Sequence, residues 1–364
     1  MRILDRYIFK SLFGIFIGCI ALFVFLYIIV DVFGHLDEIL RNKTELLLLK
    51  EYYLAYLPVI FVQIAPIACL LSTLYTLGIL SRNNEIIAMR ASGLSIWQIS
   101  KTAIIFGLVV SVFVFLLNEK QVPSAHSTIE KVKLRMEAQE NKKVAESETI
   151  KNLSMYGLKN RLFFVNKFSV KDNTLAGITI LEHDKHQNIT KKIVASSGAW
   201  KDGLWTFYNC LTYNFDENGQ IKEQPTYFKE EIMGISETPK DFLAQKQLPE
   251  FMNISKLQDY IYRLSKSGAE TVIRNLQVDL YQRYAFPFTS LVIIIVGIPF
   301  ALKIKKRVTA LASFGVSLVM GFFYYVFNAM GPAFGKAGFL PPFLAVSISH
   351  IFFLLLGLFL IYSL

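Results

Sequence analysis

Six long apolar runs without a single Asp, Glu, Lys or Arg constrain the fold of this 364-residue chain more than any other feature. An α-helix needs roughly 20 apolar residues to cross the bilayer core, so each run is a candidate transmembrane helix. The runs cover residues 11–30, 52–81, 102–118, 284–302, 308–335 and 337–364. Three precede a polar block and three follow it, and a soluble enzyme is therefore nearly excluded.

Charge is concentrated in the block between the third and fourth runs. Residues 119–283 hold 24 Lys and Arg with 21 Asp and Glu, whereas the rest of the chain has only 14 and 7. Short runs rich in Ile, Val, Phe, Tyr and Thr alternate there with turn residues, which predicts an antiparallel sandwich or jelly roll. The strands are expected at 162–170, 175–181, 189–195 and 204–213, and flanking helices at 122–141, 254–266 and 270–283.

The predicted fold is a membrane α-helical bundle of six transmembrane helices, three plus three, with an inserted all-β jelly-roll-like domain. Residues 1–118 would form helices 1–3, residues 119–283 the β-jelly-roll domain with its flanking helices, and residues 284–364 helices 4–6. Lys and Arg in short loops mark the cytoplasmic side. They cluster before the first run, after the second and after the fourth, which places both termini inside and the β domain outside.

The loop between the second and third runs contains a short helical segment, at about 82–93, between clear boundary signals. Ser81 or Asn83 can cap its start, and Gly93 can end it. Ser95 and Gln98 form a capping-box pattern that begins the next helix. We expect a rigid cytoplasmic helix here, which either transmits force from a soluble partner or lies on lipid as an interfacial helix.

Residues 85–93 of this loop resemble the coupling segment of the LptF/LptG lipopolysaccharide-export permease family. Residues 3–8 and the Pro287-Phe288 and Gly297-x-Pro299-Phe300 patterns of the fourth run are also similar to that family, as is the three-plus-three layout around a β domain. The resemblance covers essentially the whole chain and favours the LptG-like half.

The resemblance implies a permease subunit of the bacterial inner membrane that extracts lipopolysaccharide and passes it to a periplasmic bridge protein. Such a subunit pairs with a homologous permease half and sits on a cytoplasmic ATPase dimer, and its β domain is periplasmic. The family's coupling glutamate matches Glu85, and its neighbours in the coupling set here are Arg82, Met89, Arg90 and Gly93.

The nucleotide chemistry is expected in the partner. The sequence contains no G-x-x-x-x-G-K-[ST] loop, the phosphate cradle of P-loop ATPases. We therefore expect a non-catalytic chain with no cofactor of its own, and ATP and Mg bound by the partner ATPase.

Two sets of residues in and near the β domain are candidates for contact with the lipid. Exposing acyl chains to water costs about 0.8 kcal/mol per CH₂, so the tails need a continuous apolar path. That path, or an ordinary sandwich core, would be lined by Phe163, Val165, Ile178, Ile180, Trp205 and Phe207. Anionic head groups would be bound by cations near predicted helix ends, namely Arg41, Lys43, Lys120, Lys131, Lys133, Arg135 and Arg283.

Small residues at four-residue spacing can let helices approach closely. They occur in the first and fifth runs, as Gly14, Gly18, Ser313, Ser317 and Gly321. Asp31, near the end of the first run, is either a proton-coupling carboxylate or a solvated one.

Other functions remain as alternatives. His183 and His186 could suggest a metal site, but without a further ligand cluster a turn is favoured. The chain could also be a membrane-anchored periplasmic binding or signalling protein of envelope assembly, without ATP-driven transport.

Overall fold

The computed structural model describes residues 3–41, 45–140, 149–158, 160–184, 188–201, 203–216, 219–222, 224–244, 249, 252–265, 270–302 and 310–363. The chain divides into two compact units. A helical unit comprises Met1–Glu140 and Val278–Leu364, and a β unit comprises Asn141–Gln277. The predicted boundaries were 118/119 and 283/284. Those boundaries group the flanking helices with the strands, whereas the compact helical unit includes residues 122–140 and 278–285, which continue the neighbouring membrane helices.

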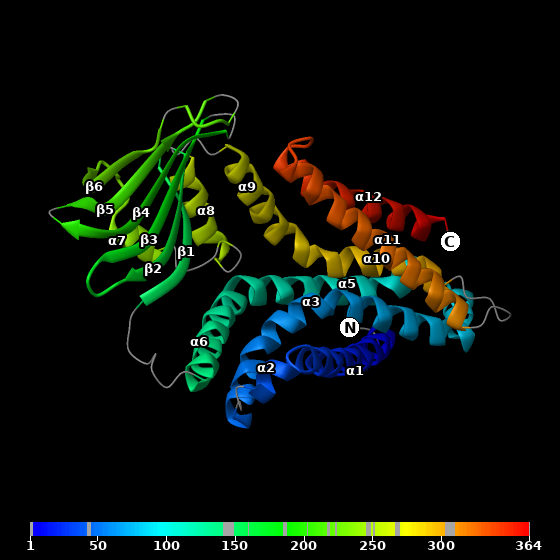
Figure 1. Cartoon of the computed structure of the whole chain (residues 1–364). Helices are drawn as coiled ribbons and strands as arrows, with labels where there is room; N and C mark the ends of the chain where they lie inside the picture. The colour runs from blue at the N-terminus through cyan, green and yellow to red at the C-terminus, as the bar shows by residue number, and fades with distance from the viewer. Residues whose placement is uncertain are drawn as a thin grey trace. The chain divides into compact units, whose positions relative to one another are not determined.

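Long helices make up the helical unit (Figure 1). In chain order they are α1 (Ile3–Gly34), α2 (Leu36–Arg41), α3 (Leu46–Arg82), α4 (Glu85–Ala91), α5 (Ile96–Leu116), the π-helical turn η1 (Leu117–Gln121) and α6 (Val122–Glu140). Helix α9 (Glu270–Ala285) begins in the β unit and crosses into the helical unit at Val278, and it is followed by the 3₁₀ turn η3 (Phe286–Phe288), α10 (Thr289–Leu302), α11 (Ala310–Lys336) and α12 (Pro342–Tyr362).

Five stretches of these helices are long and apolar enough to cross a membrane. They are α1, α3, the run from α5 through η1 into α6, the run from α9 through η3 into α10, and α12. Helix α11, of 27 residues, covers the remaining predicted span. Pro287 lies in η3, where the absence of its N–H is tolerated between two helices. A membrane helical bundle with an inserted β domain is thus confirmed.

Burial differs strongly among the helices of this unit. Helix α10 is buried almost all round, from Val292 to Pro299, and forms the centre of the core with α3, α5 and α12. Helix α1 buries only Ile8, Leu12 and Phe16, all in its first half. Most of its apolar surface therefore faces outward from this chain.

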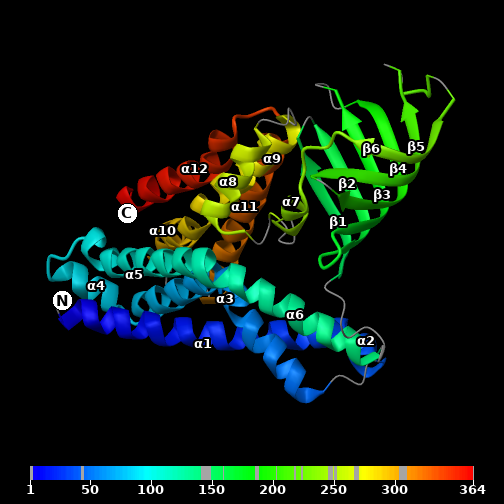
Figure 2. The same cartoon turned by 90° about the vertical axis from the view of Figure 1, so that its left-hand side faces the viewer.

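The β unit contains one antiparallel sheet of six strands in sequential order, from β1 to β6 (Figures 1 and 2). The strands are β1 (Thr149–Gly157), β2 (Arg161–Ser169), β3 (Thr174–His183), β4 (Ile189–Lys201), β5 (Leu204–Asn214) and β6 (Thr226–Met233), followed by α7 (Pro239–Ala244) and α8 (Ile254–Leu264). The all-β insertion is confirmed, but the described strands form a single meander and not two facing sheets. Phe242 of α7 joins the buried core on the inner face of the sheet.

A row of unpaired positions, one in each strand, crosses the whole sheet. The pairing skips one position in every strand, at Asn152, Asn166, Gly177, Ser196, Asn209 and Lys229. Gly177 and Asn209 have positive φ angles there, of 64° and 50°. The pairing register is the same on both sides of this line, but the buried positions change parity across it, from Phe163 and Val165 to Phe168 in β2, so both halves of the strand keep an apolar inner face.

Candidate functional site

Helix α4 begins at a sharp turn in the chain. Its N-cap is Asn84, which adopts a left-handed conformation with φ of 61°. Asn tolerates that region better than most side chains. The predicted cap at Ser81 or Asn83 is wrong, because Ser81 still belongs to α3 and the Asn83 amide instead donates to Glu85 Oε1 at 3.2 Å.

The other end of α4 has the predicted geometry. Gly93 has φ of +89°, and its N–H donates to the Arg90 carbonyl at 3.0 Å. The Leu94 N–H donates to the Met89 carbonyl at 3.2 Å, which completes a Schellman motif. Ser95 then forms both bonds of the capping box with Gln98. These bonds fix α4 between α3 and α5.

Helix α4 packs on the bundle by one face only. Ile86 is buried in the main core of the helical unit, and Met89 packs against that core. Ile87 is 63% exposed, Arg90 lies exposed about one turn further along α4, and Arg82 is exposed at the end of α3. This surface of α4 is therefore exposed in the single chain.

The half-buried Glu85 carboxylate has two hydrogen-bond donors. Tyr7 of α1 donates from its hydroxyl to Oε2 at 3.2 Å, and Asn83 donates to Oε1. Sequence reasoning missed Tyr7, since it lies 78 residues away and no local pattern links it to Glu85. Nearby, the Thr102 hydroxyl donates to Asp5 at 3.2 Å, which joins α1 to α5.

The predicted head-group cations lie on several elements. Lys120 in η1 and Lys131, Lys133 and Arg135 in α6 are exposed, while Arg283 of α9 is half-buried. Lys133 Nζ lies 6.0 Å from the centre of the Tyr52 ring, and Arg135 Nη1 lies 3.5 Å from Glu51 Oε1. Two of the cations therefore meet the start of α3. Arg41 is the last residue of α2, and Lys43 lies outside the described residues.

Tyrosines surround Asp31 at the same end of α3. Tyr53 donates its hydroxyl hydrogen to Asp31 Oδ2 at 2.9 Å, and Tyr27 donates to Tyr56 at 3.2 Å. Tyr52 stacks on Tyr56 with an interplanar angle of 8°. Asp31 thus joins α1 to α3 instead of being only solvated.

The predicted tail-path residues all lie in the core of the sheet. Phe163, Val165, Ile178, Ile180, Trp205 and Phe207 are buried together on its inner face. One register row continues from Ala195 through Cys210 to Phe228 on edge strand β6, where Phe228 is 39% exposed. Phe228, which sequence reasoning missed, marks the place where the inner face reaches solvent.

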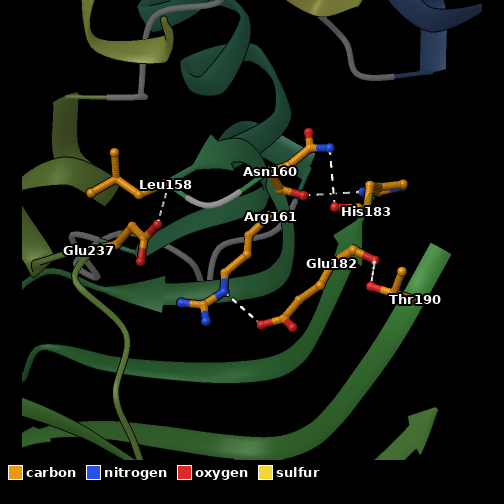
Figure 3. Close-up of polar contacts among 7 residues, drawn as sticks. All are labelled: Leu158, Asn160, Arg161, Glu182, His183, Thr190 and Glu237. Atoms are coloured by element: carbon orange, nitrogen blue, oxygen red, sulfur yellow. Dashed lines mark hydrogen bonds and ion pairs between the residues drawn. The ribbon is translucent and has the colours of Figure 1, made fainter. Parts of the chain in front are cut away.

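Hydrogen bonds and an ion pair stabilise the end of this core near the turn from β1 to β2 (Figure 3). Arg161 Nε donates to Glu182 Oε1 at 2.7 Å, and the Leu158 N–H donates to Glu237 Oε1. The Trp205 indole donates to the Glu237 carbonyl at 2.7 Å. Burial raises the pKa of the Glu237 carboxyl, against the opposing effect of its backbone donors.

The candidate packing residues do not behave alike. A Cβ at Gly14 or Gly18 would meet no described atom within 4 Å, so these glycines bring no described helix of this chain close. A Cβ at Gly321 would lie 2.9 Å from Leu70, which fits close packing of α11 on α3. Ser313 and Ser317 lie in α11.

No group of three or more His, Cys, Asp or Glu suited to a metal ion occurs among the described residues. His183 ends β3, with its ring 3.4 Å from the Asn160 carbonyl oxygen (Figure 3). His186 lies outside the part of the chain that the structure describes.

Comparison with known proteins gives a consistent result. The family model described as lipopolysaccharide export system permease LptF/LptG matches residues 6–363. The lipopolysaccharide export system permease protein LptG of Haemophilus influenzae is 22% identical over 334 residues, which cover 89% of this chain and 88% of that protein. The protein of the same name from Escherichia coli K12 is 22% identical over 372 residues, which cover 99% and 98%.

Proposed function

This chain belongs to the LptF/LptG family of lipopolysaccharide export permeases, and on that premise we propose that it is the LptG-like half of an ATP-driven exporter. It would pair with a homologous half in the bacterial inner membrane and deliver lipopolysaccharide to a periplasmic bridge protein. The two relatives, both named LptG and aligned over most of their length, support the LptG-like assignment. They give no support to a membrane anchor without transport.

The exposed face of α4 is the observation that carries the coupling role. Ile86 packs in the core, and the Schellman motif at Gly93 with the capping box of α5 fixes the end of α4, so a force on Ile87 or Arg90 would be transmitted to the bundle. We assign Glu85, Arg82, Met89, Arg90 and Gly93 to this coupling segment, with Met89 and Gly93 in structural roles. The sequence lacks a P-loop, so energy would come from a cytoplasmic ATPase dimer that binds ATP and Mg.

Orientation follows from the distribution of positive charge. Short segments rich in Lys and Arg precede α1, surround α4 and follow α10. The positive-inside rule places them in the cytoplasm. The β unit would then be periplasmic, and α4 would face the ATPase.

The β unit is proposed to shelter the acyl chains. A single sheet with an apolar inner face can hold tails that would otherwise cost about 0.8 kcal/mol per CH₂ in water. Because the inner-face residues already pack against one another, we infer that tails enter from the edge at Phe228. The basic residues of η1, α6 and α9 would bind the phosphates at the membrane surface, together with Arg41 and Lys43.

Reversing the charge at Glu85 tests the coupling role. We expect Glu85→Lys to weaken ATPase association with the purified permease pair and to reduce lipopolysaccharide release. Asp37→Lys on α2, an exposed residue at the other end of α1, makes the same change in charge and should leave both unchanged. Full association and release in Glu85→Lys would contradict the coupling role.

A further inference from the structure

The contact between α1 and α4 involves the same carboxylate that is proposed to meet the ATPase. Tyr7 donates to Oε2 of Glu85 and Asn83 donates to Oε1, so among the described residues each oxygen has one donor. A carboxylate accepts at about four lone-pair sites, so both oxygens can take a further donor from a partner. Glu85 can therefore bind a partner cation without releasing Tyr7.

The start of α1 is held to its neighbours more firmly than the rest of the helix. Ile8 and Leu12 belong to the core cluster that also contains Ile86 of α4, and Asp5 accepts a hydrogen bond from Thr102 of α5. No residue of α1 beyond Phe16 is fully buried in this chain. A displacement at this end of α1 would thus act on a helix whose second half is held to α3 only by partly buried contacts, such as the hydrogen bond from Tyr53 to Asp31.

We propose that Tyr7 is a positioning residue that links the coupling helix α4 to α1 through Glu85. This inference rests on the proposed function, since it assigns the route by which motion of α4 reaches the membrane helices. Tyr7 is 51% exposed, so water competes for the bond. The Tyr7–Glu85 hydrogen bond can consequently break and re-form, while the packing around Ile86 keeps α4 attached to the bundle.

The link between Tyr7 and Glu85 can be tested without the ATPase. Spin labels at Ile3 and Ile87, both exposed, report the distance between α1 and α4 in the full chain paired with its partner half in nanodiscs. Tyr7→Phe removes one hydroxyl and should broaden the distance distribution. Tyr75→Phe, at a tyrosine of α3 that is 55% exposed, is the matched control and should leave it unchanged. An unchanged distribution in Tyr7→Phe would overturn the proposal.

A second measurement uses the complete transporter with its ATPase. Tyr7→Phe should bind the ATPase within about twofold of the unaltered protein, while lipopolysaccharide released per ATP falls by about fivefold, the factor expected for one partly exposed hydrogen bond. Glu85→Gln keeps an oxygen that accepts from Tyr7 but removes the charge. It should therefore retain the narrow distance distribution and weaken ATPase binding.

These results separate the two proposals. If Glu85→Lys leaves ATPase binding intact, the proposed coupling role is wrong, and the spin-label distances still decide whether Tyr7 holds α4 to α1. If Tyr7→Phe leaves release per ATP unchanged, or loses ATPase binding as Glu85→Lys does, the positioning role of Tyr7 is contradicted.

Discussion

The sheet of the β unit and helix α1 of the helical unit place their large apolar side chains differently. In the β unit, aromatic residues such as Phe163 and Phe207 are buried on the inner face of the sheet. In the helical unit, α1 turns Phe25, which is 61% exposed, and Phe33 away from the core. The burial of aromatic residues in the sheet suits a domain surrounded by water, whereas the outward-facing side chains of α1 suit contact with lipid or with another apolar helix.

This difference shows where a lipid can be held. The helical unit already presents apolar surface, so acyl chains can contact it without any rearrangement. The inner face of the sheet is already packed, so in the proposed route the tails would displace packed side chains or enter where the packing ends. Phe228 on the edge strand is such an end.

The largest expected effect comes from truncating the same residue type in each unit. Phe163→Ala should destabilise the β unit by about 3–5 kcal/mol, because a fully buried ring leaves a cavity. Phe25→Ala in α1 should change stability by less than about 0.5 kcal/mol in a bilayer. Hydrogen exchange of the full chain in nanodiscs measures both. Equal losses would show that the two regions are packed alike.

A charge inserted on each exposed surface gives the next largest effect. Leu22→Arg, near the middle of α1, should lower membrane insertion by about 2.5–3.5 kcal/mol. Leu204→Arg, at an exposed position that begins β5, should be tolerated because water solvates it. A translocation assay measures the fraction of Leu22→Arg protein that integrates into the membrane. The same fraction is measured for Leu204→Arg as the control. An equal tolerance of both would argue against lipid around α1.

Glycines sharpen the contrast within the helical unit. A Cβ at Gly331 of α11 would lie 2.2 Å from the backbone oxygen of Ala345 in α12, so Gly331→Ala should cost about 1–3 kcal/mol. Gly14→Ala in α1 meets nothing described within 4 Å and should be neutral or stabilising by up to about 1 kcal/mol. Thermal unfolding in detergent compares the two, and a cost at Gly14 would point to a close neighbour from another chain.

The smallest effect concerns pH and the buried Glu237. The pKa of the Glu237 carboxyl is raised in the folded protein, so protonation of this group favours folding. Its contribution to the free energy of unfolding is complete below the ordinary glutamate pKa and is lost as pH rises through the pKa of the folded state. Glu237→Gln should remove this dependence, so the unaltered protein gains stability relative to the variant on acidification. Unfolding of the β unit is followed at several pH values by hydrogen exchange. A constant difference at all pH values would contradict the raised pKa.

Local signals predicted much of this structure. The apolar runs predicted the long helices, and Gly93, Ser95 and Gln98 predicted the end of α4 and the start of α5. Strands β1 and β6 were missed, since β6 carries Lys229, Glu230 and Glu231 along a largely exposed edge and has no clear alternation.

Contacts between distant segments could not be predicted. The bond from Tyr7 to Glu85 depends on how α1 packs beside α4, and that packing is a property of the whole bundle. The single sheet in place of a sandwich depends on every strand pairing with its sequence neighbour, which strand patterns alone do not specify. The asymmetry between Gly14 and Gly321 likewise depends on which helix face meets a neighbour.

Photocrosslinking at one edge of the sheet tests most directly whether the inner face receives lipid tails. A photoreactive side chain at Phe228 lies on the inner face, and the same group at the adjacent Tyr227, which is 58% exposed on the opposite face, is the control. We predict lipopolysaccharide adducts at position 228 only, and only when the complete transporter hydrolyses ATP. Equal adducts at both positions, or adducts independent of ATP, would contradict the account.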